Sequence, residues 1–329
     1  MIKKVLITGA TGFVGFHLIK KCLAEGYEVY AAVREYSDKR HIKELPLSYI
    51  DLDYSSVDNL RSQLEKLGCS YIIHAAGTTK AKTKADYNKV NAAYSTNLAL
   101  AASSTSFNLD KFIFVSSLAA LGPLKDLSKK LSSRSEGYPV TNYGTSKLLA
   151  EKQLAEISNL PLIVIRPTAV YGPREKDLFI LFTSIKRGLE PYIGKFNQQL
   201  SFIYVSDLAK VIVDALSSPF IGKTYNISDG ITYDRYALAL AIKKSLSIKT
   251  IKFHLPIAAV NLFASIMDLL YTRSKNTPTL NKEKMAELTA INWACDIEDA
   301  VRDLQFKPEF DLEKGIKETT DWYLANKWL

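Results

Sequence analysis

The feature that most constrains the fold is a glycine-rich segment, TGATGFVG at residues 8–15, near the start of this 329-residue chain. It follows an apolar run at Lys4–Thr8, typical of a buried strand, and it opens an amphipathic helical pattern at Phe13–Glu25. In such a unit the first glycine makes a tight turn, the second lets the main chain approach a pyrophosphate, and the third lets the helix pack closely on the sheet. The helix start adds free N–H groups and a positive dipole end for phosphate. The residues expected to bind a dinucleotide here are Gly9, Thr11, Gly12, Phe13, Val14 and Gly15.

Short β-rich apolar runs alternate with longer helical patterns through the first half of the chain. The expected strands are Lys4–Thr8, Glu28–Val33, Ser48–Asp51, Tyr71–His74, Lys111–Ser116 and Pro161–Arg166. The expected helices are Phe13–Glu25, Ser56–Leu67, Tyr87–Ser106 and Tyr143–Ser158. This alternation is typical of βαβ units with right-handed crossovers. We therefore predict an α/β fold with a doubly wound parallel sheet covered on both faces.

The regular alternation weakens in the second half, which divides the chain into two parts. We expect a dinucleotide-binding domain at residues 1–173 and a smaller mixed α/β lobe at 174–329 that mainly binds substrate. Strand-like runs at Ser201–Val205 and Thr224–Ile227 indicate that about 202–229 rejoins or extends the first domain.

Two helices are expected in the second lobe. The amphipathic segment Leu312–Trp328 should pack back onto that lobe. The apolar stretch Leu255–Leu270 has 16 residues and contains Asn261 and Asp268, so it is shorter than the roughly 20 residues that span a bilayer. We interpret it as a core or lid helix and expect no stable membrane insertion.

The charge balance and the cysteines exclude several classes of function. The chain has 43 Lys and Arg against 34 Asp and Glu, a net charge of +9, but the basic residues are scattered and no nucleic-acid motif accompanies them. An anionic cofactor and a small-molecule substrate explain this balance without a nucleic-acid partner. The three cysteines are widely spaced, which indicates neither disulfides nor a metal site. With no signal-peptide pattern at the start of the chain, we expect a cytoplasmic location.

The end of the second strand bears on the choice of cofactor. An NAD-preferring site would usually place an acidic residue there to bind both ribose hydroxyls. This chain has Arg34, with Lys39 and Arg40 close behind, and these cations suit the 2′-phosphate of NADP. Glu35, beside Arg34, keeps NAD open as the alternative.

Other strand ends should line the same crevice, because ligands of open α/β sheets bind outside the carboxyl ends of the strands. The expected cofactor contacts there are Asp51, Leu52, Ala75, Ala76, Gly77, Pro167, Thr168 and Val170. Asp51 has the alternative role of capping the next helix. We interpret His74 as a packed residue, because no second metal ligand lies at a suitable spacing.

The segment YGTSK places Tyr143 and Lys147 four residues apart, one turn apart on the same helical face. There the lysine, helped by an oxidised nicotinamide ring, would lower the pKa of the phenol for proton exchange with a substrate oxygen. The preceding strand ends in Ser116 and Ser117, and we favour Ser117 as the hydroxyl that orients the same oxygen. Asn91 is expected to anchor Lys147 through water or main chain.

The chain resembles the extended short-chain dehydrogenase/reductase family, also called the NAD-dependent epimerase/dehydratase family. The matching segments are TGATGFVG at 8–15, HAAG at 74–77, VNAAYSTNLALAA at 90–102, FIFVSSLAALG at 112–122, YGTSK at 143–147, RPTAVYGPR at 166–174, FIYVSDLA at 202–209 and YNISDG at 225–230. The resemblance implies a Rossmann-type cofactor domain and a small substrate domain. It also implies a triad of Ser117, Tyr143 and Lys147, with hydride moving between the nicotinamide and a substrate carbon. By analogy, a homodimer would pair the helices at 87–106 and 143–158.

Two departures from the family pattern reduce the range of reactions that we expect this chain to catalyse. Sugar-nucleotide dehydratases of the family have an Asp-Glu pair after the catalytic hydroxyl, where this chain has Leu118-Ala119. Many epimerases have a diphosphate-binding Arg just before the FIYV-like strand, where this chain has Gln199-Leu200-Ser201. The substitutes available for that cation are Arg174, Lys176 and Arg235.

The apolar pair and Arg34 resemble the dihydroflavonol-reductase and 3β-hydroxysteroid-dehydrogenase side of the family. The leading hypothesis is therefore an oxidoreductase that interconverts a secondary alcohol and a ketone, with NADP preferred. The alternative is a nucleotide-sugar epimerase with retained NAD. A third, less favoured, is a cofactor-binding sensor or assembly factor without catalysis, against which the intact Ser117, Tyr143 and Lys147 argue.

Overall fold

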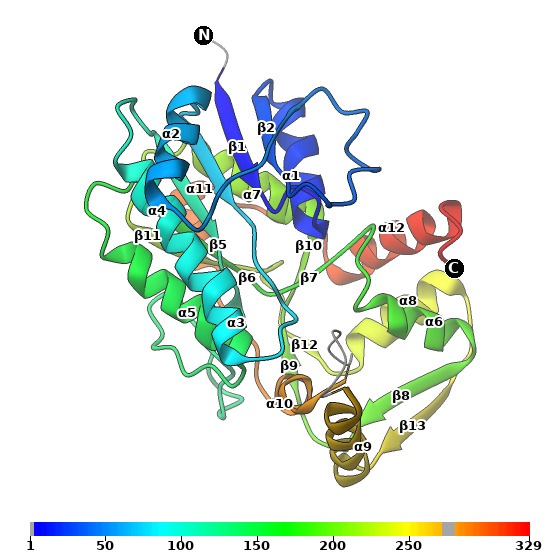
Figure 1. Cartoon of the computed structure of the whole chain (residues 1–329). Coiled ribbons are helices and arrows are strands. Elements are labelled where there is room, and N and C mark those ends of the chain that lie inside the picture. Colours follow the sequence, from blue (N-terminus) through cyan, green and yellow to red (C-terminus); the bar gives the residue numbers. More distant parts are fainter. Residues whose placement is uncertain (1–2, 272–279) are drawn as a thin grey trace.

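The computed structural model describes residues 3–271 and 280–329 and is built on a seven-stranded sheet (Figure 1). Its strand order is β11-β6-β5-β4-β1-β2-β3, and every neighbouring pair is parallel. The strands are β1 (Lys4–Thr8), β2 (Glu28–Ala32), β3 (Ser48–Ile50), β4 (Tyr71–His74), β5 (Lys111–Val115), β6 (Leu162–Pro167) and β11 (Lys223–Ile227). The order reverses between β1 and β4, which confirms the doubly wound, Rossmann-type fold expected from the sequence.

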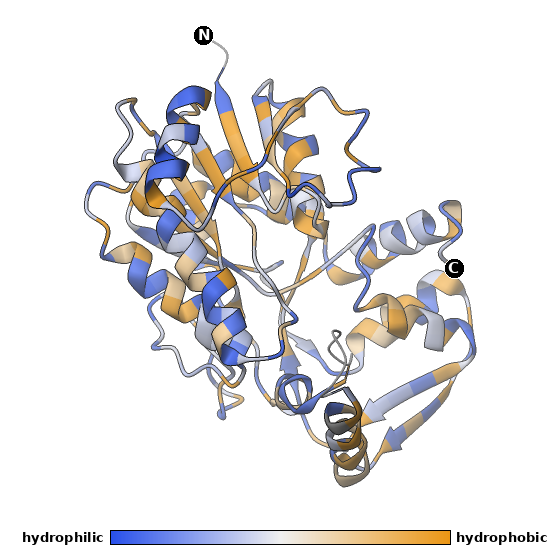
Figure 2. Cartoon of the chain, viewed as in Figure 1, coloured by the Kyte–Doolittle hydropathy of each residue, from blue (hydrophilic) through white to orange (hydrophobic). Residues whose placement is uncertain are grey.

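Helices cover both faces of this sheet. They are α1 (Phe13–Ala24), α2 (Val57–Leu67), α3 (Lys84–Asn88), α4 (Tyr94–Ser103), α5 (Asn142–Ala155), α7 (Val205–Leu216) and α11 (Glu298–Leu304). Strand side chains alternate between the faces, so in β1 Val5 and Ile7 join the core under α1, α7 and α11, while Leu6 joins the core under α2, α4 and α5. Figure 2 shows the apolar strands at the centre of these layers.

Two sequence expectations need correction here. The segment expected as a single helix at 87–106 is α3, then a π-helical turn at Lys89–Ala93, then α4, which ends at Ser103. The expected strand at 201–205 is β10 (Phe202–Tyr204), which does not rejoin the large sheet but pairs with β7 (Ala169–Tyr171). The chain returns to the large sheet only with β11.

A second group of elements lies beside the carboxyl ends of the strands, toward the lower right of Figure 1. Its helices are α6 (Phe179–Lys186), α8 (Ala237–Leu246), α9 (Ile257–Leu270), α10 (Lys282–Thr289) and α12 (Leu312–Ala325). Its short strand pairs are β8 (Leu189–Ile193) with β13 (Ile251–Leu255), in parallel, and β9 (Gln199–Leu200) with β12 (Tyr233–Asp234), antiparallel. An aromatic core joins α6 to α12, where Phe182 and Tyr323 stack edge to face at 5.1 Å. Within the described residues, no helix combines the length and the apolar character needed to cross a bilayer.

Candidate active site

The glycine-rich segment forms the turn between β1 and α1, and close main-chain approach demands its glycines. Gly9 has φ of +68°, and a Cβ there would lie 2.6 Å from the carbonyl oxygen of Ala75. A Cβ at Gly15 would lie 2.1 Å from the carbonyl oxygen of Gly9, so only glycine lets α1 pack this closely on the turn. The N–H of Gly12 donates to the Gly9 carbonyl at 2.9 Å and closes the turn.

The start of α1 offers donors to an anionic ligand. Gly12 is the exposed N-cap, and it has no side chain to accept from the first N–H groups, whereas Thr141 caps α5 by accepting from the N–H of Gly144. The N–H groups in the first turn of a helix, here from Phe13 onward, have no intrahelical acceptor. The positive end of the helix dipole lies at the same place. The turn therefore fits a dinucleotide pyrophosphate, which Gly9–Gly15 would hold.

His74 ties the loop after β4 to the loop after β1. Ser95 Oγ donates to the Asn91 carbonyl, so His74 Nε2 must donate to Ser95 Oγ (2.8 Å) and Nδ1 must accept from Thr8 Oγ1 (2.7 Å). Thr8 Oγ1 in turn accepts from the N–H of Ala76. Burial lowers the pKa of His74 to about 3, consistent with this neutral tautomer. His74 is thus a packed residue that sets the path of residues 75–77 past Gly9.

Asn91 lies in the π-helical turn and organises the same loop. Its Oδ1 accepts from the N–H of Thr78 (2.7 Å), and its Nδ2 donates to the Thr78 carbonyl and to Ser146 Oγ, both at 2.9 Å. Ser146 is the neighbour of Lys147 on α5. Asn91 therefore positions α5, which carries Lys147, and the loop that contains Gly77. The Lys147 ammonium itself bonds to a different group, the carbonyl of Val115.

The Lys147 ammonium lies at the end of β5. Its Nζ donates to the carbonyl of Val115 at 2.9 Å and lies 4.7 Å from the centre of the Phe114 ring. A Cβ on Gly77 would come within 3.3 Å of Nζ, so the loop after β4 passes directly over the ammonium. Burial lowers the pKa of Lys147 to about 8, while the charge of Glu151 opposes this shift.

Tyr143 and Ser117 come together where α5 meets the turn after β5. Ser117 begins a short 3₁₀ turn (η2, Leu118–Ala120), and a Cβ on Gly144 would lie 2.3 Å from the carbonyl of Ala119, so η2 and α5 touch main chain to main chain. In the protein alone, burial raises the pKa of Tyr143 to about 12, and a hydrogen bond with Ser117 opposes the shift. The expected lowering of this phenol pKa by Lys147 and an oxidised nicotinamide concerns the cofactor-bound protein and stays a prediction; in the protein alone, desolvation determines the direction of the shift.

A buried hydrogen-bond network engages Ser116 and so distinguishes it from its neighbour Ser117. Ser116 Oγ donates to Glu151, whose carboxylate also accepts two bonds from Nε of Arg166 and one from Nη2 at 2.5 Å. Arg166 Nη1 donates to the Ser133 carbonyl. Ser116 is 3% exposed and committed to this network, while Ser117 remains half-buried beside Tyr143. Sequence reasoning missed Glu151 and Arg166, which lie within the segments 143–158 and 161–174 that it did single out.

A second contact that the sequence did not indicate ties α10 to the catalytic helix. Glu283 accepts from the N–H of Asn142 at 3.3 Å and also from its side-chain amide. Asn142 precedes Tyr143 directly, so α10 lies over the start of α5. Burial raises the pKa of Glu283, while its bonds with Asn142 lower it.

The end of β2 presents the residues expected to distinguish the cofactors. Arg34 is exposed, and its carbonyl accepts from the N–H of Ser37 to close a turn, whereas Arg40 is engaged by Asp38. At the end of β3, Leu52 is buried and Asp51 is exposed. Asp51 does not cap α2, because that cap is Ser56, which accepts from the N–H of Asn59.

The stretch after β6 runs back toward α1. Pro167 and Thr168 are buried, with the N–H of Thr168 bonded to the Ile227 carbonyl, and Val170 packs at the edge of the core that includes α1. Further along, the Arg174 guanidinium lies 4.4 Å from the centre of the Phe16 ring on α1. The structure thus brings this stretch and the glycine-rich turn to the same end of the sheet.

A buried apolar cluster begins with the residue that follows Ser117. Leu118 and Leu121 pack with Leu131 and Cys295, and Leu124 and Trp293 extend the cluster. At the position expected to hold a diphosphate-binding cation, Leu200 is half-buried in β9.

Arg235, one of the possible substitutes for that cation, is engaged elsewhere. It donates to the carbonyls of Phe196 and Ile193 and lies 4.3 Å from the centre of the Phe196 ring. No group of three or more His, Cys, Asp and Glu side chains within the described parts of the chain could hold a metal ion.

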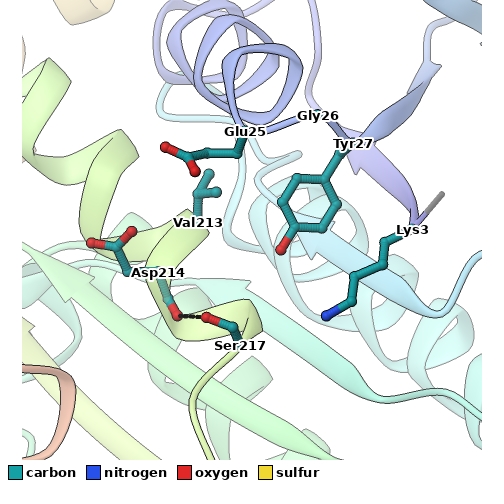
Figure 3. Close-up of a pocket in the computed structure, with 7 residues that line it drawn as sticks. All are labelled: Lys3, Glu25, Gly26, Tyr27, Val213, Asp214 and Ser217. Carbon is teal, nitrogen blue, oxygen red and sulfur yellow. Dashed lines mark hydrogen bonds between the residues drawn. The ribbon is translucent and has the colours of Figure 1, made fainter. Parts of the chain in front are cut away.

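The pocket drawn in Figure 3 lies at the opposite, amino-terminal end of β1 and β2. Lys3 precedes β1 and Tyr27 precedes β2, while Asp214 and Ser217 come from the end of α7. The Ser217 hydroxyl donates to the Asp214 carbonyl at 3.0 Å. Because doubly wound sheets bind their ligands at the carboxyl ends of the strands, this pocket is separate from the cofactor crevice.

Comparisons with known proteins agree with this geometry. Residues 5–228 match the NAD dependent epimerase/dehydratase family. A UDP-glucose 4-epimerase from Vibrio cholerae is 28% identical over 98% of this chain and 96% of its own length. A ceramide reductase from Caulobacter vibrioides is also 28% identical, over 99% of this chain and 96% of its own length. Among solved structures, a UDP-glucose 4-epimerase from Thermotoga maritima superposes with a TM-score of 0.80 at 19% identity, covering 98% of this chain and 99% of that one. Relatives of equal identity thus have names from two reaction classes, and the choice between them depends on the residues of the site.

Proposed function

Because the chain belongs to the NAD-dependent epimerase/dehydratase family, we propose that it is a net oxidoreductase of that family, one that interconverts a secondary alcohol and a ketone on a largely apolar substrate. The observation that carries this proposal is the apolar pair Leu118-Ala119 directly after Ser117, continued by Leu121 and Leu131. A substrate oxygen held by Ser117 would lie next to this buried apolar cluster, where positions 118 and 119 carry no carboxylate.

The bound nicotinamide would supply or accept the hydride. Ser117 would hold the reacting oxygen by a hydrogen bond, as it holds the phenol of Tyr143 in the free protein. Tyr143, whose raised pKa keeps the phenol protonated at neutral pH, would donate that proton to the oxygen as a ketone becomes an alcohol. Lys147, fixed on the Val115 carbonyl, would stabilise the phenolate left behind and contact the cofactor ribose.

The apolar residues at the two positions after Ser117 argue against water elimination. A dehydratase needs carboxylates at the positions of Leu118 and Ala119 to move protons to and from the departing hydroxyl. These side chains are apolar and buried, with 3% and 8% of their surface exposed. The relative named ceramide reductase supports an apolar substrate.

NADP is the cofactor we propose, with NAD as the alternative. Arg34 is exposed just beyond β2, where the ribose of a dinucleotide bound at the Gly9–Gly15 turn would extend. A 2′-phosphate there would gain a charge-assisted hydrogen bond from the guanidinium. Several solved structures of similar fold hold NAD, among them a UDP-glucuronic acid 4-epimerase from Bacillus cereus, and this supports a dinucleotide of this general class.

A nucleotide-sugar epimerase with retained NAD is the second candidate. The similarity to the Vibrio cholerae UDP-glucose 4-epimerase over nearly the whole chain favours it. Against it, Leu200 lies where a diphosphate-binding cation is expected, and Arg235 is bonded to the Ile193 and Phe196 carbonyls.

Two further properties belong to this proposal. A homodimer through α4 and α5 is supported by Leu100, which is 40% exposed on the outer face of α4, and sedimentation velocity would test it. A reducing, cytoplasmic location is supported by the free, buried Cys22, Cys69 and Cys295, whose thiol pKa values burial raises to about 12.

The proposal is tested by asking whether the protein retains a cofactor. Purified, dialysed protein is denatured, the released small molecules are identified by mass spectrometry, and a second portion is titrated with NADPH and NADH. A net oxidoreductase releases little nucleotide, binds NADPH more tightly and oxidises it in the presence of long-chain ketones. Stoichiometric NAD together with interconversion of UDP-sugars would replace the proposal with the epimerase. If the protein turns over neither substrate class and NADPH alters its binding to a protein partner, the non-catalytic sensor would be favoured.

A further inference from the structure

One face of the C-terminal lobe is apolar and exposed. In the β8–β13 pair, Leu189 lies opposite Ile251 and Ile193 lies opposite Leu255, and these residues share one face because side chains alternate along a strand. On this face Leu189, Ile251 and Leu255 are 44%, 71% and 40% exposed. On the other face, Glu190 and Tyr192 of β8 are buried, whereas Lys252 of β13 is exposed.

The exposed face continues onto α9, which follows β13 directly. Leu262, Phe263, Ile266 and Leu270 recur at helical spacing and are 65%, 54%, 46% and 68% exposed. The opposite side of α9 is also apolar, since Val260 and Ala264 pack against Met285 and Ile193. Of the two interpretations of this segment from the sequence, a core helix does not fit its exposed outer side, and a lid helix stays a prediction. Asn261, Ser265 and Asp268 form a polar stripe between these two apolar sides, and the large exposed side chains of the outer side are unusual for a water-exposed surface.

Basic residues frame the apolar face. Lys186, Arg187 and Lys249 lie at one end of the β8–β13 pair, Lys195 lies at the other, and all four are exposed. None takes part in the ion pairs found within residues 3–271 and 280–329. Glu190, the acidic residue between them in sequence, is buried and bonded to Lys243. An apolar centre with a cationic border is complementary to an anionic lipid surface.

This face is also one helix away from the catalytic residues. α9 packs on α10, and Glu283 of α10 holds the main chain of Asn142, the residue before Tyr143. Figure 1 shows α9 and α10 side by side at the end of the lobe, on the side of the β8–β13 pair. A substrate that moves along α9 and α10 from a surface would thus arrive at the start of α5.

We propose that the face formed by β8, β13 and α9 docks the protein on the surface of an anionic phospholipid bilayer. The 14-residue α9 lies in the interface with its outer side among the acyl chains, and Lys186, Arg187, Lys195 and Lys249 contact the phosphate groups. A second copy of the chain is a poorer occupant, because a two-fold contact through this face would bring the same cations together. Delivery of a membrane-resident substrate to Tyr143 is a consequence that rests on the proposed function, whereas docking itself does not.

The test is co-sedimentation of the full chain with vesicles of phosphatidylcholine and phosphatidylglycerol, 7 to 3, without any substrate. Wild type should pellet with these vesicles, more weakly with phosphatidylcholine alone, and less at high salt because screening weakens the contribution of the cations. Leu262→Ser/Phe263→Ser should lower the partition coefficient at least about tenfold, as expected for removing two apolar side chains from the interface. The matched control, Val301→Ser/Leu324→Ser, changes two residues that are 48% and 47% exposed on other helices and should bind as wild type does.

A second variant, which changes charged rather than apolar side chains, tests the proposal independently. Lys195→Glu/Lys249→Glu changes only exposed side chains and should abolish the preference for phosphatidylglycerol, with NADPH binding retained as evidence of folding. Wild type remaining in the supernatant, or equal binding by the α9 double variant and its control, would overturn the proposal. If Leu262→Ser/Phe263→Ser instead converts a dimer to a monomer and vesicles bind no variant, the occupant is a second copy. Because no turnover is measured, failure here leaves the proposed reaction unaffected.

Discussion

Lys147 donates a hydrogen bond from its ammonium to the main-chain carbonyl of Val115, 2.9 Å away at the end of β5. The side chain is almost fully buried, and burial lowers the pKa of Lys147 to about 8. The buried charge of Lys147 is therefore a cost to the stability of the free protein, and replacing Lys147 by an uncharged residue should reveal that cost.

Lys147→Met is expected to raise the free energy of unfolding at pH 7 by about 1–2 kcal/mol, after allowing for the lost bond to Val115. The pKa of Lys147 is about 8 in the folded chain and higher in the unfolded chain. Between pH 8 and about 10.5, Lys147 is therefore protonated in the unfolded chain but mostly neutral in the folded chain. The penalty is fully present below pH 8 and fades as the pH rises through this window. Urea unfolding of both proteins at pH 7, 8.5 and 10 measures it.

Lys152→Met, on an exposed lysine of the same helix, serves as the control and should differ from wild type by less than about 0.5 kcal/mol at each pH. An advantage of Lys147→Met that stays constant or grows toward pH 10 would contradict the assignment of the cost to the buried charge.

The two neighbouring serines should separate activity from stability. Ser117→Ala removes the hydroxyl beside Tyr143 and should lower kcat by about 10²–10³-fold, as for the loss of a donor at a reacting oxygen. Ser116→Ala should leave kcat within about threefold, because the Ser116 hydroxyl is committed to Glu151, and should cost about 1–2 kcal/mol of stability. Steady-state kinetics and thermal unfolding of both variants check this, and the reverse pattern would mean that Ser116 is the catalytic hydroxyl.

The Glu151–Arg166 ion pair should behave as a buried unit. Both side chains are about nine-tenths buried and joined by several hydrogen bonds, so Glu151→Ala leaves an unpaired guanidinium and should cost about 3–5 kcal/mol. Glu151→Leu/Arg166→Met removes both charges and should cost less than Glu151→Ala alone. Urea titrations of the wild type and both variants give the two losses of stability, and a double variant less stable than Glu151→Ala would contradict the assignment of the loss to an unpaired guanidinium.

The local motifs were predictable because each needs only a few neighbouring residues. The glycine spacing at residues 9, 12 and 15, the Tyr143–Lys147 pair and the six strands of the first half all follow from turn geometry or periodicity. The doubly wound parallel sheet then follows from right-handed crossovers, whereas the order of its seven strands is known only from the structure. The preference for Ser117 over Ser116 also came from position alone, and the network around Ser116 now gives it a physical basis.

The features that could not be predicted from the sequence depend on contacts between residues that are far apart in the chain. Asn142 and Glu283 are 141 residues apart, so no local pattern pairs them. The raised pKa of Tyr143 depends on how deeply η2 and α5 bury it, which spacing does not reveal. For α9, periodicity distinguishes neither a buried nor an exposed face, because both sides of the helix are apolar.

Arg34 should determine cofactor preference. Arg34→Asp is expected to weaken NADPH binding by about 10–100-fold through loss of a charge-assisted bond to the 2′-phosphate, with NADH binding within about threefold of wild type. Arg40→Ala, at an exposed arginine already engaged by Asp38, is the control and should change neither. Fluorescence titrations of the wild type and both variants with both cofactors measure the six constants, and an equal loss for NADPH and NADH would assign Arg34 to the shared part of the cofactor.

The role of Tyr143 as the proton donor is the centre of this account, and Tyr143→Phe removes only the phenolic oxygen. The decisive measurement is single-turnover oxidation of bound NADPH by a hydrophobic ketone, compared between wild type and this variant at pH 7. The account predicts a rate at least about 10²-fold lower with the Kd for NADPH unchanged, since only proton transfer is lost. A rate within threefold of wild type, with the cofactor still bound, would contradict it.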